Sequence, residues 1–189
     1  KKIFKNIYIQ PASGDAGGSL GAALAISHMY FDNDRVYSQC YDLMKGAYLG
    51  PYFSEKEIIT MNKRYRAVSK KIEEFDKLSE EIAKIISDGY VVGWFQGRSE
   101  FGPRALGNRS ILADPRNPEM QKKLNLKIKY REGFRPFAPS VMEEDYDNFF
   151  DSQFISPYML FVDNIKDDIK LDIKDDYSNL NYWDKLYTL

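Results

Sequence analysis

The chain has 189 residues, with 27 Lys and Arg against 28 Asp and Glu, and a formal net charge of −1 excludes a protein that binds nucleic acid over its whole surface. Hydrophobic residues make up 43% of the sequence, which suffices for a globular core in one domain, or in one domain and part of another. No apolar run approaches the roughly 20 residues needed to span a bilayer, and the single Cys40 excludes a disulfide within the chain and favours a reducing cytoplasm.

The N-terminal region combines a strand pattern, a glycine-rich loop and a helix pattern. Residues 3–9 (IFKNIYI) predict a short strand, 11–21 (PASGDAGGSLG) a loop, and 19–29 a helix of small residues. This order is used to seat a phosphate at a helix N-terminus. The spacing matches neither the dinucleotide fingerprint nor the Walker A loop, and a tight turn in which Asp15 or Ser19 caps a buried helix explains it equally well.

A connector follows over residues 30–69, rich in Asp, Asn, Gly and Pro, and a domain boundary fits here. It contains one short helix, since Ser54 and Glu57 have the spacing of a capping box. Residues 70–88 then place apolar side chains at helical spacing, and Gly89 is a typical C-terminal stop.

Strand and helix patterns alternate in the rest of the chain, which predicts an α/β layer domain. Strands are expected at Tyr90–Phe95, ended by Gly97, at Ser110–Ala113 and at Tyr158–Val162; helices at Pro118–Lys127 and Met142–Asp151; an edge strand or ordered loop at Phe134–Val141; and a solvated strand pair or mobile loop at Asp163–Asp176.

Residues 90–140 carry a local surplus of positive charge. Arginines alternate there with glycines and apolar residues, an arrangement that suits phosphate or carboxylate because guanidinium donates in a planar fork and glycine admits close backbone N–H groups. The cations are Arg98, Arg104, Arg109, Arg116, Lys122, Lys123, Lys127, Lys129, Arg131 and Arg135, against Glu100, Asp114, Glu119 and Glu132.

The same residues are also compatible with purely structural roles. Arg104 and Arg109 can pair with Glu100 and Asp114 in a purely structural network, since buried arginines are usually paired. The aromatic side chains of Trp94 and Phe95 suit the core better than they suit stacking on an adenine.

Four stretches, in order, resemble the O-carbamoyltransferases of nodulation-factor and antibiotic biosynthesis: QPASGDAGGSLGAAL, YLGPYFSEKEI, GWFQGRSEFGPRALGNRSILADPR and YREGFRPFAPSVM. In such enzymes an actin-like, ATPase-type N-terminal domain transfers a carbamoyl group to a hydroxyl. A C-terminal domain similar to threonylcarbamoyl-adenylate synthases makes carbamoyl adenylate from carbamoyl phosphate and ATP.

The resemblance implies a mixed α/β fold like that of the threonylcarbamoyl-adenylate synthases, preceded by a strand-loop-helix remnant of the actin-like domain. Residues 1–45 would be this remnant, 46–69 a connector, and 70–189 the carbamoyl-adenylate-forming domain. The His-Val-Asp-Gly-Thr-Ala-Arg and Asn-Thr-Ser-Phe-Asn stretches that usually follow in the family are missing, so the resemblance predicts a piece of a longer protein with an incomplete pocket.

By the same resemblance, Arg104, Lys129 and Arg135 would grip carbamoyl phosphate and the phosphates of ATP, and Glu100 and Glu132 would orient the arginines. Asp15 would be a ligand for the Fe²⁺ or other divalent metal of the transfer domain, and Mg²⁺ would accompany ATP. Further substrate or ATP contacts would come from Arg98, Glu100, Gly102, Arg109, Ser110 and Arg131.

The expected partners are carbamoyl phosphate, ATP and a hydroxyl of a sugar or natural product, in the cytoplasm, with no membrane or nucleic acid involved and a homodimer allowed. Two other classes of function are compatible with the same sequence. A nucleic-acid or phosphate-binding module would use the same cations together with exposed aromatic side chains. A non-catalytic fragment would use them only to bridge to the rest of the enzyme.

Overall fold

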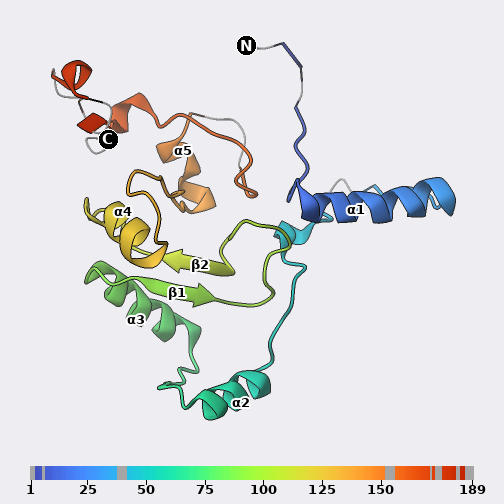
Figure 1. Ribbon diagram of the computed structural model, residues 1–189, viewed down its shortest axis with the longest axis horizontal. Helices are drawn as coiled ribbons and strands as arrows, with labels where there is room; N and C mark the ends of the chain where they lie inside the picture. Colours follow the sequence, from blue (N-terminus) through green and yellow to red (C-terminus); the bar gives the residue numbers. More distant parts are fainter. Residues whose placement is uncertain are drawn as a thin grey trace. The chain divides into compact units, whose positions relative to one another are not determined.

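The computed structural model describes most of the chain, and Cys40 lies outside the described residues (Figure 1). It divides into two compact units that interleave along the sequence: Lys1–Phe75, Gly93–Ile111 and Ser156–Phe161 form the first, and Asp76–Val92, Leu112–Ile155 and Val162–Leu189 the second. The described residues are 3–5, 7–37, 42–151, 156–170, 172, 176–181 and 184–185.

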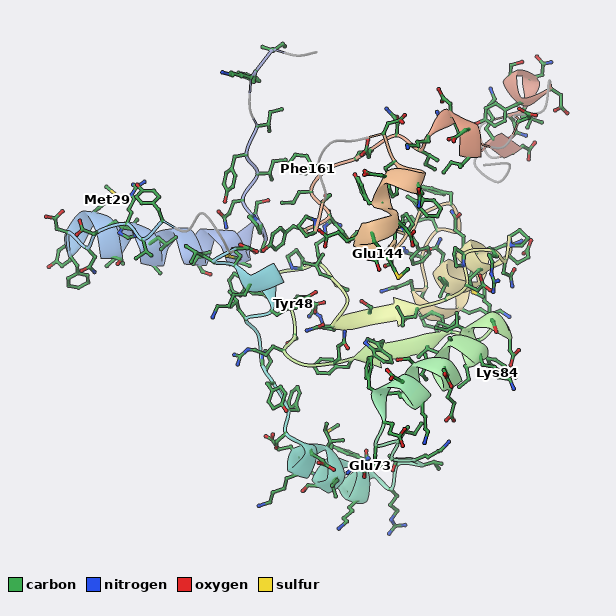
Figure 2. All side chains as sticks on the ribbon, turned by 180° about the vertical axis from the view of Figure 1, so that it is seen from behind. Met29, Tyr48, Glu73, Lys84, Glu144 and Phe161 are labelled. Carbon is green, nitrogen blue, oxygen red and sulfur yellow. The ribbon has the colours of Figure 1, made fainter. Side chains whose placement is uncertain are left out.

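Helix α1, Asp15–Ala25, continues as a π-helix, η1, over Ile26–Tyr30. The helix therefore begins four residues before the predicted Ser19. Its N-cap is Gly14, and no side chain caps it, so the prediction of a cap by Asp15 or Ser19 is wrong. The Ser19 hydroxyl instead donates to the carbonyl of Ala16. The expected burial of this helix is also wrong, because none of its residues is buried (Figure 2).

Two predicted strands are wrong. The described residues of 3–9 form no strand, and their large side chains are exposed, Ile7 by 67% and Tyr8 by 79%. A strand needs a partner for its backbone groups, and no described strand pairs with this one. Tyr158–Val162 contains a turn instead, in which Met159 has a φ of 52° and its N–H donates to the Ser156 carbonyl.

The connector has the predicted helix. After the 3-10 helix η2, Lys45–Ala47, helix α2 runs over Glu55–Tyr65. Ser54 is its N-cap: the Glu57 N–H donates to the Ser54 hydroxyl at 3.4 Å, and the Ser54 N–H donates to the Glu57 carboxylate at 2.8 Å. The capping box is confirmed, and hydrogen bonds from the side chain and then the backbone of Ser54 lower the pKa of Glu57.

Two strands confirm the predictions for the centre of the chain. β1, Val92–Phe95, and β2, Arg109–Leu112, run in opposite directions as a two-stranded sheet (Figure 1). Residues 96–108 connect them, and Gln96 N–H donates to the Asn108 carbonyl at 3.0 Å. Phe95 is 49% exposed, which contradicts its predicted place in the core. The described chain is thus mixed α/β with a small sheet.

Helix α3, Phe75–Ser87, begins later than the predicted residue 70 and ends one residue before the predicted residue 88. Gly89 follows in the predicted stop position, with a φ of 86°. Helix α4 covers Met120–Lys123, two residues later than predicted, and continues as a π-helix, η3, over Leu124–Ile128. Met120 and Leu124 are buried in the second unit, and so is Asn125.

The remaining elements are short. Residues 134–141 are a loop, which confirms one of the two alternatives, and the acidic helix appears as η4 followed by α5. The tail has a single bridge between Phe150 and Ile165 in its described part. The bounds are Glu143–Asp145 for η4, Tyr146–Phe149 for α5, Asp167–Ile169 for η5 and Tyr177–Asn179 for η6.

Candidate functional site

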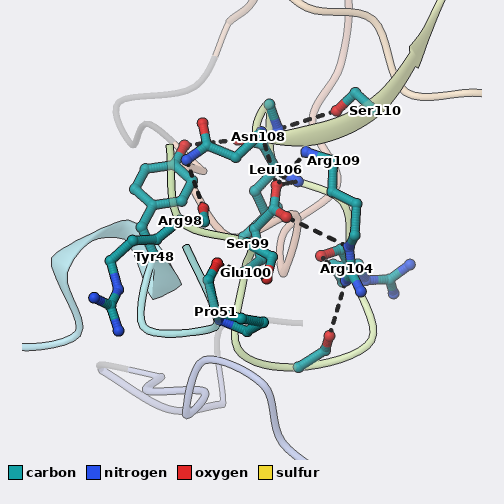
Figure 3. Close-up of polar contacts among 12 residues, drawn as sticks. Tyr48, Pro51, Arg98, Ser99, Glu100, Arg104, Leu106, Asn108, Arg109 and Ser110 are labelled. Carbon is teal, nitrogen blue, oxygen red and sulfur yellow. Dashed lines mark hydrogen bonds and ion pairs between the residues drawn. The ribbon is translucent and has the colours of Figure 1, made fainter. Parts of the chain in front are cut away.

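The loop between β1 and β2 carries four of the predicted site residues, Arg98, Glu100, Gly102 and Arg104, and is fastened to the segment 47–51 (Figure 3). Two more, Arg109 and Ser110, begin β2 directly after the loop. Gly50 N–H donates to the Ser99 carbonyl at 2.9 Å, and Ser99 N–H donates to the Pro51 carbonyl at 3.0 Å. The Tyr48 hydroxyl adds a bond of 2.7 Å to the carbonyl of Leu106. These bonds hold the arginine-bearing loop against a segment about fifty residues earlier in the sequence.

Glu100 organises this loop from inside (Figure 3). Its side chain is fully buried, and its Oε1 accepts the N–H groups of Leu106 at 2.6 Å, Asn108 at 2.9 Å and Arg109 at 3.3 Å. Burial disfavours the carboxylate and is the largest single influence on the pKa of Glu100. The backbone N–H groups together outweigh it and lower the pKa. The result is a charged anchor for residues 106–109.

Arg109 lies beside this anchor. Its Nε is 3.5 Å from Oε2 of Glu100, an oxygen that has no hydrogen-bond partner among the described residues. One of its terminal nitrogens donates to the carbonyl of Gly102 at 3.2 Å. The structural interpretation of Arg109 as a partner of Glu100 is therefore confirmed, and the expectation that Glu100 orients an arginine toward a ligand stays a prediction.

Arg104 behaves differently. Asp114 forms an ion pair with Arg116, in which Nη2 of Arg116 lies 2.6 Å from Oδ2 of Asp114. Hydrogen bonds from the side chain and backbone of Arg116 lower the pKa of Asp114 to about 2. In the described part of the chain, the Arg104 guanidinium makes no hydrogen bond or ion pair, so its predicted pairing with Glu100 or Asp114 is wrong. The side chain is exposed.

Arg104 lines a cavity of about 110 Å³ within the first unit. The other lining residues are mostly apolar and include Ser13, Phe101, Leu106 and Leu160. A guanidinium that has no partner among the described residues and lies at the edge of an apolar hollow is suited to hold an anionic group in a place where water competes less.

Gly102 allows two loops to meet beside this cavity. Its φ is 115°, and a Cβ added there would lie 2.6 Å from the Cβ of Ala12. Arg98 is exposed and donates at 3.4 Å to the carbonyl of Leu49. The Ser110 hydroxyl accepts the N–H of Gly107 at 3.1 Å, a bond that ties the end of the loop to β2. The three predicted contact residues thus shape the loop.

Asp15, the predicted metal ligand, is exposed in the first turn of α1. Among the described residues, no group of three or more His, Cys, Asp or Glu could hold a metal ion. One carboxylate binds a divalent ion weakly, so these residues do not by themselves fit the metal that the resemblance implies.

The second unit contains the remaining predicted cations, Lys129, Arg131 and Arg135. Arg135 Nε lies 2.9 Å from Glu132 Oε2. The pKa of Glu132 is lowered, first by a backbone hydrogen bond and then by the charge of Arg135. The ion pair is the contact that the expected role of Glu132 in orienting an arginine requires, and the role itself stays a prediction. Lys129 is exposed at the end of η3, where its N–H donates to the carbonyl of Leu124.

Asn125 was not predicted as a site residue, yet it is fully buried and bonded to the loop that carries Arg131 and Arg135. The available signal was an Asn and a Gln four residues apart, Gln121 and Asn125, in a helix pattern whose other polar residues are mostly charged.

No described helix is long and apolar enough to cross a membrane.

Comparisons with known proteins agree on one family. An uncharacterized protein of Synechocystis is 50% identical over 97% of this chain, and nodulation protein NolNO of Sinorhizobium fredii is 45% identical over 85%. The 3'-hydroxymethylcephem-O-carbamoyltransferase of Amycolatopsis lactamdurans is 32% identical over 87%. The chain spans 30%, 23% and 28% of the lengths of these relatives, respectively.

The family model described as carbamoyltransferase C-terminus matches residues 83–178, which include β1, β2, the loop between them and the Asn125 region. With the motifs and the relatives in agreement, the chain belongs to the O-carbamoyltransferase family.

Proposed function

We propose that this chain forms the carbamoyl-adenylate-forming part of an ATP-dependent O-carbamoyltransferase. The observation that carries the proposal is the Arg104 guanidinium, which has no partner among the described residues and lines a small cavity on a loop fixed by Glu100. Family membership supplies the reaction class, and the names of relatives such as the cephem carbamoyltransferase support a hydroxyl as the acceptor.

The chemistry explains why such a site is rich in arginine. Carbamoyl phosphate, ATP and water would give carbamoyl adenylate, inorganic phosphate and pyrophosphate, and the acceptor hydroxyl would then take the carbamoyl group as AMP leaves. Both substrates are polyanions, so fixed cations must offset their repulsion before they react. In the proposal Arg104, Lys129 and Arg135 serve this role, with Mg²⁺ bound to the ATP phosphates.

Arg98, Arg109 and Arg131 would assist, with Arg109 held by Glu100 and less free to turn than Arg104. Gly102 and Ser110 would shape the loop around the anion. A divalent metal at Asp15 would need further ligands, and no step is assigned to it.

The test uses the intact protein that contains this chain and measures pyrophosphate release that depends on carbamoyl phosphate. Arg104→Ala and Arg135→Ala are expected to abolish release while leaving the circular dichroism spectrum unchanged. Arg116→Ala is the matched control, because this arginine lies in the same basic window but is engaged by Asp114. Unchanged release in both test variants would remove these arginines from the site.

Two further measurements separate the alternatives. A nucleic-acid module predicts binding of random RNA or DNA at low salt that falls steeply at high salt. A fragment that only bridges to the rest of the enzyme predicts no heat of binding with ATP or carbamoyl phosphate in calorimetry. The proposal predicts heat with both ligands and no nucleic-acid binding.

A further inference from the structure

Asn125 is fully buried, and the hydrogen bonds of its side-chain amide all go to one loop. Its Nδ2 donates to the carbonyl of Gly133 at 3.0 Å and to that of Arg135 at 2.8 Å. Its Oδ1 accepts from Nε of Arg131 at 2.7 Å. The backbone carbonyl of Asn125 also accepts the N–H of Arg131 at 2.9 Å. The amide orientation is chemically determined, because one end faces two acceptors and the other a donor.

These bonds fix the direction of a side chain as well as the backbone. Arg131 is held at Nε by Asn125, and the centre of its guanidinium lies 4.9 Å over the ring of Phe137. Within the described chain, no hydrogen bond occupies its terminal nitrogens. A guanidinium held at Nε and on one face keeps its outer edge available for a planar or tetrahedral anion.

The backbone at Arg135 is held in a similar way. Its carbonyl accepts from Asn125 and, at 3.3 Å, from the exposed side chain of Gln121. Its side chain is turned by the ion pair with Glu132. The helix from which both amides reach out contains the π-turn η3, a form that is frequent at functional sites.

We propose that Asn125 is a positioning residue that sets Arg131 and Arg135 for anion binding, although its own amide is too buried to meet a ligand. The inference rests on the proposed function and names a residue that acts through the two arginines. A side chain with only a structural role would affect the stability of the second unit and leave ligand affinity unchanged.

The experiment measures the Kd of MgATP and of carbamoyl phosphate by calorimetry, and the melting temperature, in the intact protein. Asn125→Asp keeps an acceptor for Arg131 but turns an oxygen toward the carbonyls of Gly133 and Arg135, so the loop is displaced. Charge-assisted hydrogen bonds from arginine to an anion depend on direction, so a loss of at least about tenfold in affinity is expected for one or both ligands.

Leu124→Ala is the matched control. Leu124 is also buried, adjoins Asn125 in the chain and makes no side-chain bond to the loop. It should lower the melting temperature and leave both Kd values within about twofold of wild type, since cavities act on stability. A third comparison adds Asn125→Asp to the Arg131→Ala, Arg135→Ala double variant, where it should cost no further affinity because the positioned groups are gone.

The positioning role is overturned if Asn125→Asp binds both ligands like wild type, or if it costs the same factor with and without the two arginines. If Asn125→Asp does not fold, Gln121→Ala decides: the loss of this exposed donor to the Arg135 carbonyl should cost about threefold or more in affinity, and wild-type affinity overturns the role. A wild-type protein that binds neither ligand refutes the proposed function itself, and the inference with it.

Discussion

Replacement of Glu100 is the sharpest test of how the arginine loop is held. Glu100→Ala removes the acceptor of three backbone N–H groups, which lie 2.6, 2.9 and 3.3 Å from Oε1. Glu100→Gln is the matched variant, because its amide oxygen can still accept the same three bonds but carries no charge. The two variants separate the loss of an acceptor from the loss of a charge.

The magnitudes follow from the geometry. A buried N–H without an acceptor costs about 1–3 kcal/mol, but part of the loop is exposed and can rehydrate, so about 3–5 kcal/mol is expected for Glu100→Ala. In Glu100→Gln the two shorter bonds lose charge assistance worth about 1 kcal/mol each. The contact with Arg109 adds less than about 1 kcal/mol because that arginine is 46% exposed. The expected total for Glu100→Gln is about 2–3 kcal/mol.

Urea unfolding at pH 7 and at acid pH measures both effects. Because the fold lowers the pKa of Glu100 below its ordinary 4.5, the stability that the charge supplies is complete above pH 4.5 and is lost as pH falls through the folded pKa. The gap between wild type and Glu100→Gln should therefore close on acidification. A change below about 0.5 kcal/mol for Glu100→Ala, typical of a surface position, would refute the reasoning.

Three other predictions concern the surroundings of the loop. Asp114 should titrate near pH 2 in NMR, and Arg116→Ala should raise its pKa toward the ordinary 3.8; a pKa that stays low would contradict the assigned cause. Ser54→Ala should destabilise α2 by about 1 kcal/mol, measured by amide hydrogen exchange, and unchanged protection would show that the capping box contributes little. Gly102→Ala should destabilise by about 1–3 kcal/mol, because its Cβ would lie 2.6 Å from that of Ala12, and Ala12→Gly should recover part of the loss in thermal unfolding; equal losses in the single and double variants would exclude the clash.

Elements governed by neighbours in sequence could be predicted. The capping box at Ser54, the stop at Gly89, and the two strands β1 and β2 lie where the patterns place them, within a residue or two. Each depends on a turn, a cap or a short run of β-branched and aromatic residues, which acts over a few positions. Local chemistry was sufficient there.

Elements that depend on partners distant in the sequence could not be predicted from the sequence. The stretch 3–9 has a strand composition, yet a strand exists only when another strand accepts its backbone bonds. The start of α1 at Asp15 puts two glycines inside the helix, against their low helix propensity.

The candidate site shows the same division. Glycines and arginines in residues 98–109 indicated a loop that binds an anion. Only the fold determines that Arg109 pairs with Glu100 and that Arg104 has no partner among the described residues. Asn125 was not predicted because its amide bonds to backbone carbonyl groups eight and ten residues further along the chain. Backbone carbonyls leave no signal in the pattern of side chains.

The bonds that join residues 47–51 to the arginine loop bear on any attempt to shorten the protein. A truncated version that starts at α3 would retain every arginine of the basic window but would remove the backbone partners of Ser99 and the Tyr48 hydroxyl that donates to the Leu106 carbonyl. The minimal piece worth producing for crystallography or ligand screening therefore starts upstream of Ala47, since Phe101 N–H also depends on its carbonyl.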